Sequence, residues 1–225
     1  MNAKASASAG PEQVRRFRER YRAQEIPRGY SPRAHVIFTF IGGTAALLAC
    51  VWQLQDVKAL EWITVPLAFL YANLAEYFGH RYPMHRPMHP LKAVYKRHSG
   101  QHRAYFNADS MPLTDWLDLR AVLFPPLLVV FFFGVFGTPV WFALRYLISA
   151  NVAWLFIATG VAYFLNYEIL HLLHHAPRHW RIAQTGLLKR WSALHRTHHD
   201  PALMSHKNFN ITYPIGDLLF RTWKG

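Results

Sequence analysis

The sequence predicts an all-α membrane protein with four transmembrane helices, and two observations support this prediction. Four long apolar runs stand out, at residues 36–54, 62–78, 121–140 and 146–167. Hydrophobic residues make up 52% of the chain and charged residues only 16%, against about 25% charged in a typical globular protein. A soluble core can bury one such run, but four runs of this length are typical of a protein that crosses a bilayer.

Residues 1–35 precede the first run and are predicted to be a basic, cytosolic segment. Residues 1–10 are rich in Ala and Ser and are expected to be disordered. Residues 15–22 contain five arginines and two aromatic residues. They fit either an amphipathic helix at the lipid headgroups or a solvated charged helix, and the sequence favours neither. We recognise no signal peptide, because no cleavable apolar region follows the first charges at the expected distance.

The first two runs are predicted to form a helical hairpin. Residues 36–54 carry no charge and are long enough, as a helix, to cross about 30 Å of hydrocarbon. Residues 55–61 form a short polar turn, and residues 62–78 are charged only at Glu76. The turn is too short to hold a domain, so the two helices are expected to lie antiparallel.

The third and fourth runs are predicted to form the remaining two spans. Residues 121–140 have two prolines near their start and the sequence Gly-Thr-Pro at their far end, at positions 137–139. Residues 146–167 are uncharged and are followed directly by Glu168 and His171. The fourth helix is therefore expected to continue out of the membrane.

The basic residues predict the orientation of these helices. An even number of spans puts residues 1–35, 79–120 and 168–225 on one face, and these segments hold eight, seven and eight of the 25 Lys and Arg residues. Only Lys58 and Arg145 fall on the other face. By the positive-inside rule the basic face, with both termini, is cytoplasmic, in a bacterial inner membrane or the endoplasmic reticulum. This accounts for the formal net charge of +13 without a nucleic-acid partner.

Histidines gather on the same predicted face. Thirteen of the fourteen lie within residues 80–102 or 171–206, and many are spaced so that they share one side of a helix. Clustered neutral imidazoles are a poor core and a good ligand set for transition metals. The predicted metal ligands, with no catalytic residue beyond them, are His80, His85, His98, His102, His171, His175, His195, His198 and His199.

The number of ligands and the absence of other motifs favour two iron ions. Cys50 is the only cysteine, and no His-Glu-x-x-His motif is present, which argues against a structural zinc module or a zinc protease. Zinc needs only four ligands, whereas nine fit two iron ions of higher coordination number. Zinc is expected only as a replacement in purified protein.

Residues 60–225 resemble the integral-membrane fatty acid hydroxylase / sterol desaturase superfamily. The resemblance rests on Glu76-x3-His80-Arg-x3-His85, His98-x3-His102, His171-x3-His175, His195-x2-His198-His199 and the tail at residues 208–222. It implies that residues 36–225 form a hydroxylase-like domain, a four-helix stalk with a cytosolic helical cap over a dimetal site. Such a protein hydroxylates a lipid (fatty acyl, sterol or related) with O2 and electrons from a separate electron-transfer protein.

One feature departs from this family. Its second cluster usually ends in a His-His pair, and here either Gln101 stands in place of the first histidine or Arg103 in place of the second. Glutamine can coordinate weakly through its carbonyl oxygen, but arginine cannot bind a metal. Residues considered as additional ligands or as supports for the ligands are Gln101, His174, Glu76 and Asp217. His35, His89, His179 and His206 are expected to lie at surfaces, interfaces or loops.

Three alternatives stay open at this point. A lipid desaturase would use the same oxidant, and sequence does not separate it from a hydroxylase. A catalytically inactive relative is suggested by Gln101 and Arg103. A metal-binding or metal-transport protein would need ionisable residues in the middle of its spans, where the sequence has only Asn73, Asn151 and a few hydroxyl groups. The substrate and the oligomeric state are not predicted.

Overall fold

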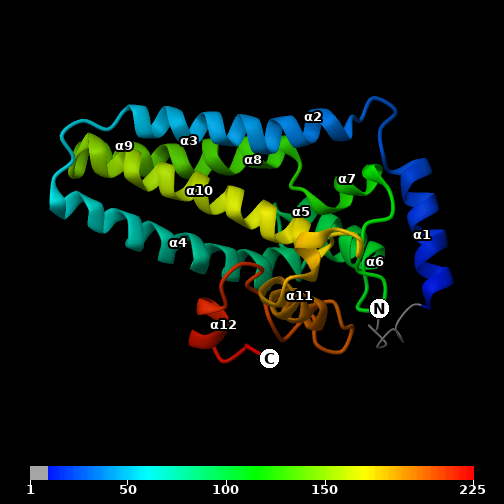
Figure 1. The fold of residues 1–225 in the computed structure, drawn as a ribbon. Coiled ribbons are helices and arrows are strands. Elements are labelled where there is room, and N and C mark those ends of the chain that lie inside the picture. The colour runs from blue at the N-terminus through cyan, green and yellow to red at the C-terminus, as the bar shows by residue number, and fades with distance from the viewer. Residues whose placement is uncertain (1–9) are drawn as a thin grey trace. The chain divides into compact units, whose positions relative to one another are not determined.

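The computed structural model describes residues 10–225, so nearly all of the start predicted to be disordered lies outside the described residues. Every regular element in the described part is a helix, which confirms the all-α prediction there (Figure 1). Three helical stretches are long and apolar enough to cross a membrane: Pro32–Trp52, Trp116–Leu147 and Ala150–His174. The second apolar run forms α4 (Thr64–Gly79), a helix of 16 residues. These stretches indicate a membrane protein.

The chain divides into two compact units. Residues Ser31–Ala72 and Leu123–Ile169 form one, here called the apolar unit. The segments up to Tyr30, Asn73–Val122 and Leu170–Gly225 form the other, here called the histidine unit, because it contains every histidine except His35.

The apolar unit is a set of long helices arranged around α10 (Ala150–His174). Phe69 of α4 packs edge-on against Tyr163 of α10, with ring centroids 5.4 Å apart. A Cβ atom at Gly43 would lie 2.7 Å from the Leu165 side chain, so glycine allows this helix to pack closely on α10. Its elements are α2 (Pro32–Val36), η1 (Ile37–Gly42), α3 (Gly43–Trp52), η2 (Ala59–Ile63), the start of α4, α8 (Pro126–Phe132), η6 (Phe133–Gly137), α9 (Thr138–Leu147) and most of α10.

The third apolar run is longer than the sequence predicts. The helix continues through Gly137 and Pro139 as η6 and α9, and only Ile148 and Ser149 separate it from α10. The missing N–H of Pro139 falls next to the wider π-helical turns of η6, where the regular hydrogen-bond ladder is already interrupted. Proline therefore does not end the helix here. At the other end of the run, the helix is broken at residues 123–125, directly before Pro126.

The histidine unit consists of short helices and loops. Two of its π-helical segments, η3 and η4, carry histidines of the first two clusters. Its elements are α1 (Pro11–Gln24), the end of α4, η3 (His80–Met84), α5 (Lys92–Tyr95), η4 (Lys96–His102), α6 (Arg103–Tyr105), η5 (Trp116–Asp118), α7 (Leu119–Val122), the end of α10, η7 (Arg181–Gln184), α11 (Gly186–His198) and α12 (Ile215–Leu219).

The basic segment at residues 15–22 lies within α1, which packs on the protein rather than standing free in solvent. The Arg18 side chain is only 6% exposed. Its guanidinium donates to the carbonyls of Tyr105, Ser110 and Pro112 at 2.9, 2.5 and 3.1 Å. An amphipathic helix is thus present, but its inner face contacts the 105–112 loop. Neither expectation for the segment included this contact with the rest of the protein.

Two carboxylates, the buried Asp217 and the half-buried Glu76, fix the C-terminal segment. Asp217 accepts hydrogen bonds from the backbone N–H groups of Phe209 and Asn210 at 2.9 and 2.8 Å. Glu76 accepts from the Thr212 backbone at 3.1 Å and from its hydroxyl at 2.7 Å. Both carboxylates, predicted as possible ligands or supports, therefore position the tail next to the histidines.

We expect Asp217→Asn to lower the free energy of unfolding by about 2–3 kcal/mol, because the amide cannot accept every bond that the buried carboxylate accepts. Thermal unfolding of the purified protein measures this change. Asp109→Asn is the matched control, since Asp109 is 63% exposed and its substitution should leave the unfolding midpoint unchanged. Equal midpoints for the two variants would contradict this role of Asp217.

Candidate metal centre

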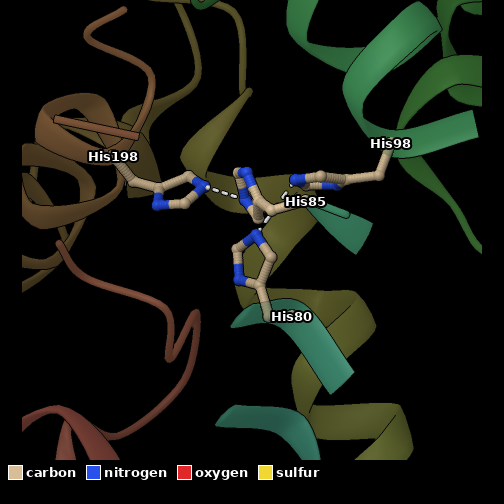
Figure 2. Close-up of side chains that lie close together, drawn as sticks. All are labelled: His80, His85, His98 and His198. Atoms are coloured by element: carbon tan, nitrogen blue, oxygen red, sulfur yellow. Dashed lines mark hydrogen bonds between the residues drawn. The ribbon is translucent and has the colours of Figure 1, made fainter. Parts of the chain in front are cut away.

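Eight histidines of the histidine unit form two groups of four. Within each group one nitrogen of every imidazole lies within 4.8 Å of one nitrogen of each of the other three. Group A consists of His80, His85, His98 and His198, whose rings converge in Figure 2. Group B consists of His102, His175, His195 and His199. Each group places four nitrogen ligands around one point, as a metal site requires.

The two groups draw on the same sequence clusters and lie side by side. His98 and His102 belong to one segment, η4, yet His98 enters group A and His102 enters group B, with their rings stacked 5.4 Å apart. At the end of α11, the neighbours His198 and His199 also separate into the two groups, 6.1 Å apart. Ions in both groups would be close neighbours, which fits the predicted dimetal site.

Backbone carbonyls orient the imidazoles of group B. The Nδ1 atoms of His102, His175 and His199 lie 2.9, 2.9 and 2.5 Å from the carbonyl oxygens of Ala121, Met111 and Phe106. A carbonyl can only accept, so each Nδ1 carries the proton and each Nε2 keeps its lone pair. His195 Nε2 lies 3.1 Å from the Nε2 atoms of both His175 and His199. Such support is typical of metal-binding histidines.

Group B is fully buried, and its chemistry fits a metal ion. The Nε2 atom of His102 is buried without a hydrogen-bond partner, which is costly unless something binds it. Burial lowers the pKa of His102 and of His199 well below the usual histidine value, so both rings are neutral at pH 7 and can coordinate. Four neutral imidazoles suit iron, zinc or copper rather than magnesium or calcium.

Group A is less enclosed. His85 and His98 are half-buried, whereas His80 and His198 are buried. The Nδ1 atom of His198 donates to the Lys207 carbonyl at 2.9 Å, and that of His80 donates to the Phe209 carbonyl. The Nε2 atoms of His80 and His98 are 3.0 Å apart, and those of His85 and His198 are 3.2 Å apart. The tail held by Asp217 thus supplies two of the carbonyls that orient this group.

The ninth predicted ligand, His171, lies beside group B. Its buried ring is 4.9 Å from the His102 ring and 5.2 Å from the His195 ring. His174 differs, because protein groups contact both of its nitrogens: the Ser192 hydroxyl at 3.2 Å and the Ile211 carbonyl at 3.1 Å. His174 therefore supports the tail and does not contribute to either group.

The remaining candidates lie outside both groups. The Gln101 amide donates to the Glu25 carboxylate at 3.2 Å, so its side chain reaches towards the chain that follows α1. His35 is buried in the apolar unit, 2.9 Å from the Phe124 carbonyl. His89, His179 and His206 are exposed. The supporting carbonyls were not predicted, because a backbone acceptor leaves no signature in the sequence.

The fold and the site together define a class: an all-helical, membrane-type protein with two adjacent four-histidine groups suited to transition metals. Comparison with family models, with curated proteins and with solved structures gives no match for this chain. The function is therefore argued from the site.

Proposed function

We propose that this protein is a membrane-bound, non-haem diiron oxygenase that hydroxylates a lipid. One observation carries the proposal: two groups of four converging imidazoles lie next to each other in one compact unit. A pair of iron ions bound there would supply the activation of O2 that attack on an unreactive C–H bond requires. Zinc is expected to occupy the same groups when iron is lost.

The chain's own residues would position the ions and shield them. Each carbonyl bonded to an Nδ1 atom fixes both the ring orientation and the nitrogen that faces the ion. Group B is enclosed, with His102 and His195 each 3% exposed and His175 and His199 at 0%. This enclosure would keep water away from an ion bound there. Group A, with two half-buried rings, is the more accessible of the two.

A lipid substrate and the four-span topology belong to the same proposal. The helices of the apolar unit expose many large apolar side chains, among them Leu48 at 63%, Leu127 at 81% and Phe136 at 53%. Such surfaces fit lipid contact. We propose that α4 is the fourth span, that the histidine unit is a cytoplasmic cap, and that a separate electron-transfer protein docks on its basic surface.

We expect the detergent-purified protein to contain two metal ions per chain and, once loaded with iron, to consume O2 only with both a reductant and a lipid. Elemental analysis and an oxygen electrode measure these quantities. Mass spectrometry of the lipid separates the reactions: a product with one added oxygen supports hydroxylation, and one that has lost two hydrogens supports desaturation. Two ions without O2 consumption would favour a metal-binding or inactive protein, and the oxygenase proposal would then fail.

A further inference from the structure

Arg103 faces His85 in group A. The Nη1 atom of Arg103 lies 3.3 Å from the Nδ1 atom of His85 and donates to it. A guanidinium has donors only and does not lose its proton in proteins. The Nδ1 atom of His85 must therefore accept this bond with its lone pair, so in the neutral ring the proton is on Nε2.

A short chain of contacts holds Arg103 in this position. The same Nη1 atom donates to the Ser99 hydroxyl at 3.2 Å, and that hydroxyl donates to the Met84 carbonyl at 2.7 Å. Met84 is the residue directly before His85. The guanidinium is thereby tied to the backbone that carries the imidazole, and its contact with His85 follows from the local structure.

His85 thus differs from the five histidines of groups A and B whose Nδ1 atoms donate to carbonyls. In those rings the Nε2 lone pair is left for a metal ion. In His85 the Nε2–H points at the Nε2 atom of His198, 3.2 Å away, whose own proton is held by the Lys207 carbonyl. For His85 to bind a metal through Nε2, its proton would have to move to Nδ1, where it would face the Arg103 donor.

We propose that Arg103 withholds His85 from coordination, so that group A holds its ion through His80, His98 and His198 and more weakly than group B holds its own. The proposal rests on the function proposed above only in requiring both groups to bind metal. Three protein ligands leave a coordination position open, which is the usual arrangement of a catalytic metal, whereas four close the site. Group A is then the more readily exchanged of the two sites.

The test is a titration of the metal-free, full-length protein with Zn²⁺ in competition with a chelator. We expect two binding steps whose affinities differ by about 10–100-fold, the range by which the partners of metal ligands tune affinity. With Arg103 in place, His85→Ala should change the weaker affinity by less than about threefold, whereas His80→Ala should abolish the weaker step.

Substitution of Arg103 provides the second arm. Arg103→Leu removes the donor, so the weaker step should approach the stronger one, and His85→Ala should now weaken it by about tenfold or more. Arg103→Lys keeps a cationic donor and should preserve the gap between the two steps. Lys96→Leu is the matched control, because Lys96 is exposed on the same segment. Thermal unfolding identifies any variant that fails to fold. If the Arg103 variants do, the comparison of His85→Ala with His80→Ala decides the inference by itself.

Two equal Zn²⁺ affinities in the unsubstituted chain would overturn this inference. So would an equal loss of affinity on His85→Ala whether position 103 is Arg or Leu. Either result would leave the metal centre intact. Failure of Zn²⁺ to bind to either group would overturn the proposed function and this inference together.

Discussion

Replacing His199 with alanine is expected to remove one of the two metal ions and to lower lipid oxidation by more than about 100-fold. The loss should exceed the 10–100-fold cost of losing a partner of a metal ligand, because a ligand itself is removed. His199 is fully buried, and the Phe106 carbonyl fixes its Nδ1 atom. Its Nε2 atom is 3.1 Å from that of His195. Elemental analysis of the purified variant, with product formation from lipid, measures the two effects.

Two other histidines are controls for this substitution. His206→Ala changes an exposed ring and should leave metal content and activity unchanged. His174→Ala changes a buried ring that contacts Ser192 and Ile211, so it should reduce stability while both ions are retained. If His199→Ala kept two ions per chain, group B would not be a metal site, and the dimetal proposal would have to be abandoned.

The helices were predictable because long apolar runs and helical histidine spacing are local properties of the sequence. The exact ends of the helices were less predictable. Pro139 was expected to lie where the third run ends, but π-helical turns before it allow the helix to continue to Leu147. A sequence pattern read at a regular helical period does not anticipate turns of this wider kind.

The histidines that come together in the candidate site could be picked out from the sequence, but their division into two groups could not. All eight histidines of groups A and B were among the nine predicted from their spacing. Spacing suggested that His98 and His102 could share one face of a helix, yet each belongs to a different group. Tertiary packing decides which rings come together. From the sequence, Arg103 was considered only because it can stand where the similar family usually has a histidine. Its contact with His85 depends on Ser99 and on the fold around it.

The α1 helix shows the limit of amphipathic patterns most clearly. Its arginines and aromatic residues predict a helix with two different faces but do not say what covers the inner face. A lipid surface and solvent were the two expectations. In the structure the inner face contacts the loop at residues 105–112, through the buried Arg18. The pattern thus gave the helix but not the protein surface that its inner face contacts.

Replacing Arg18 with methionine is therefore expected to lower the free energy of unfolding by about 3–5 kcal/mol, since three carbonyl groups lose their donor at a buried site. The same change should weaken metal binding at group B by about 10–100-fold. The carbonyls that Arg18 holds are those of Tyr105, Ser110 and Pro112. They flank Phe106 and Met111, whose own carbonyls orient His199 and His175.

Arg20→Met is the matched control, because Arg20 lies on the exposed face of the same helix and should change neither quantity. Thermal unfolding measures stability, and Zn²⁺ titration against a chelator follows the two binding steps. Loss of affinity confined to the stronger step would show that α1 acts through the loop on group B. An equal loss in both steps would mean that Arg18 supports the histidine unit as a whole. Unchanged metal binding in Arg18→Met would show that α1 does not affect the metal centre.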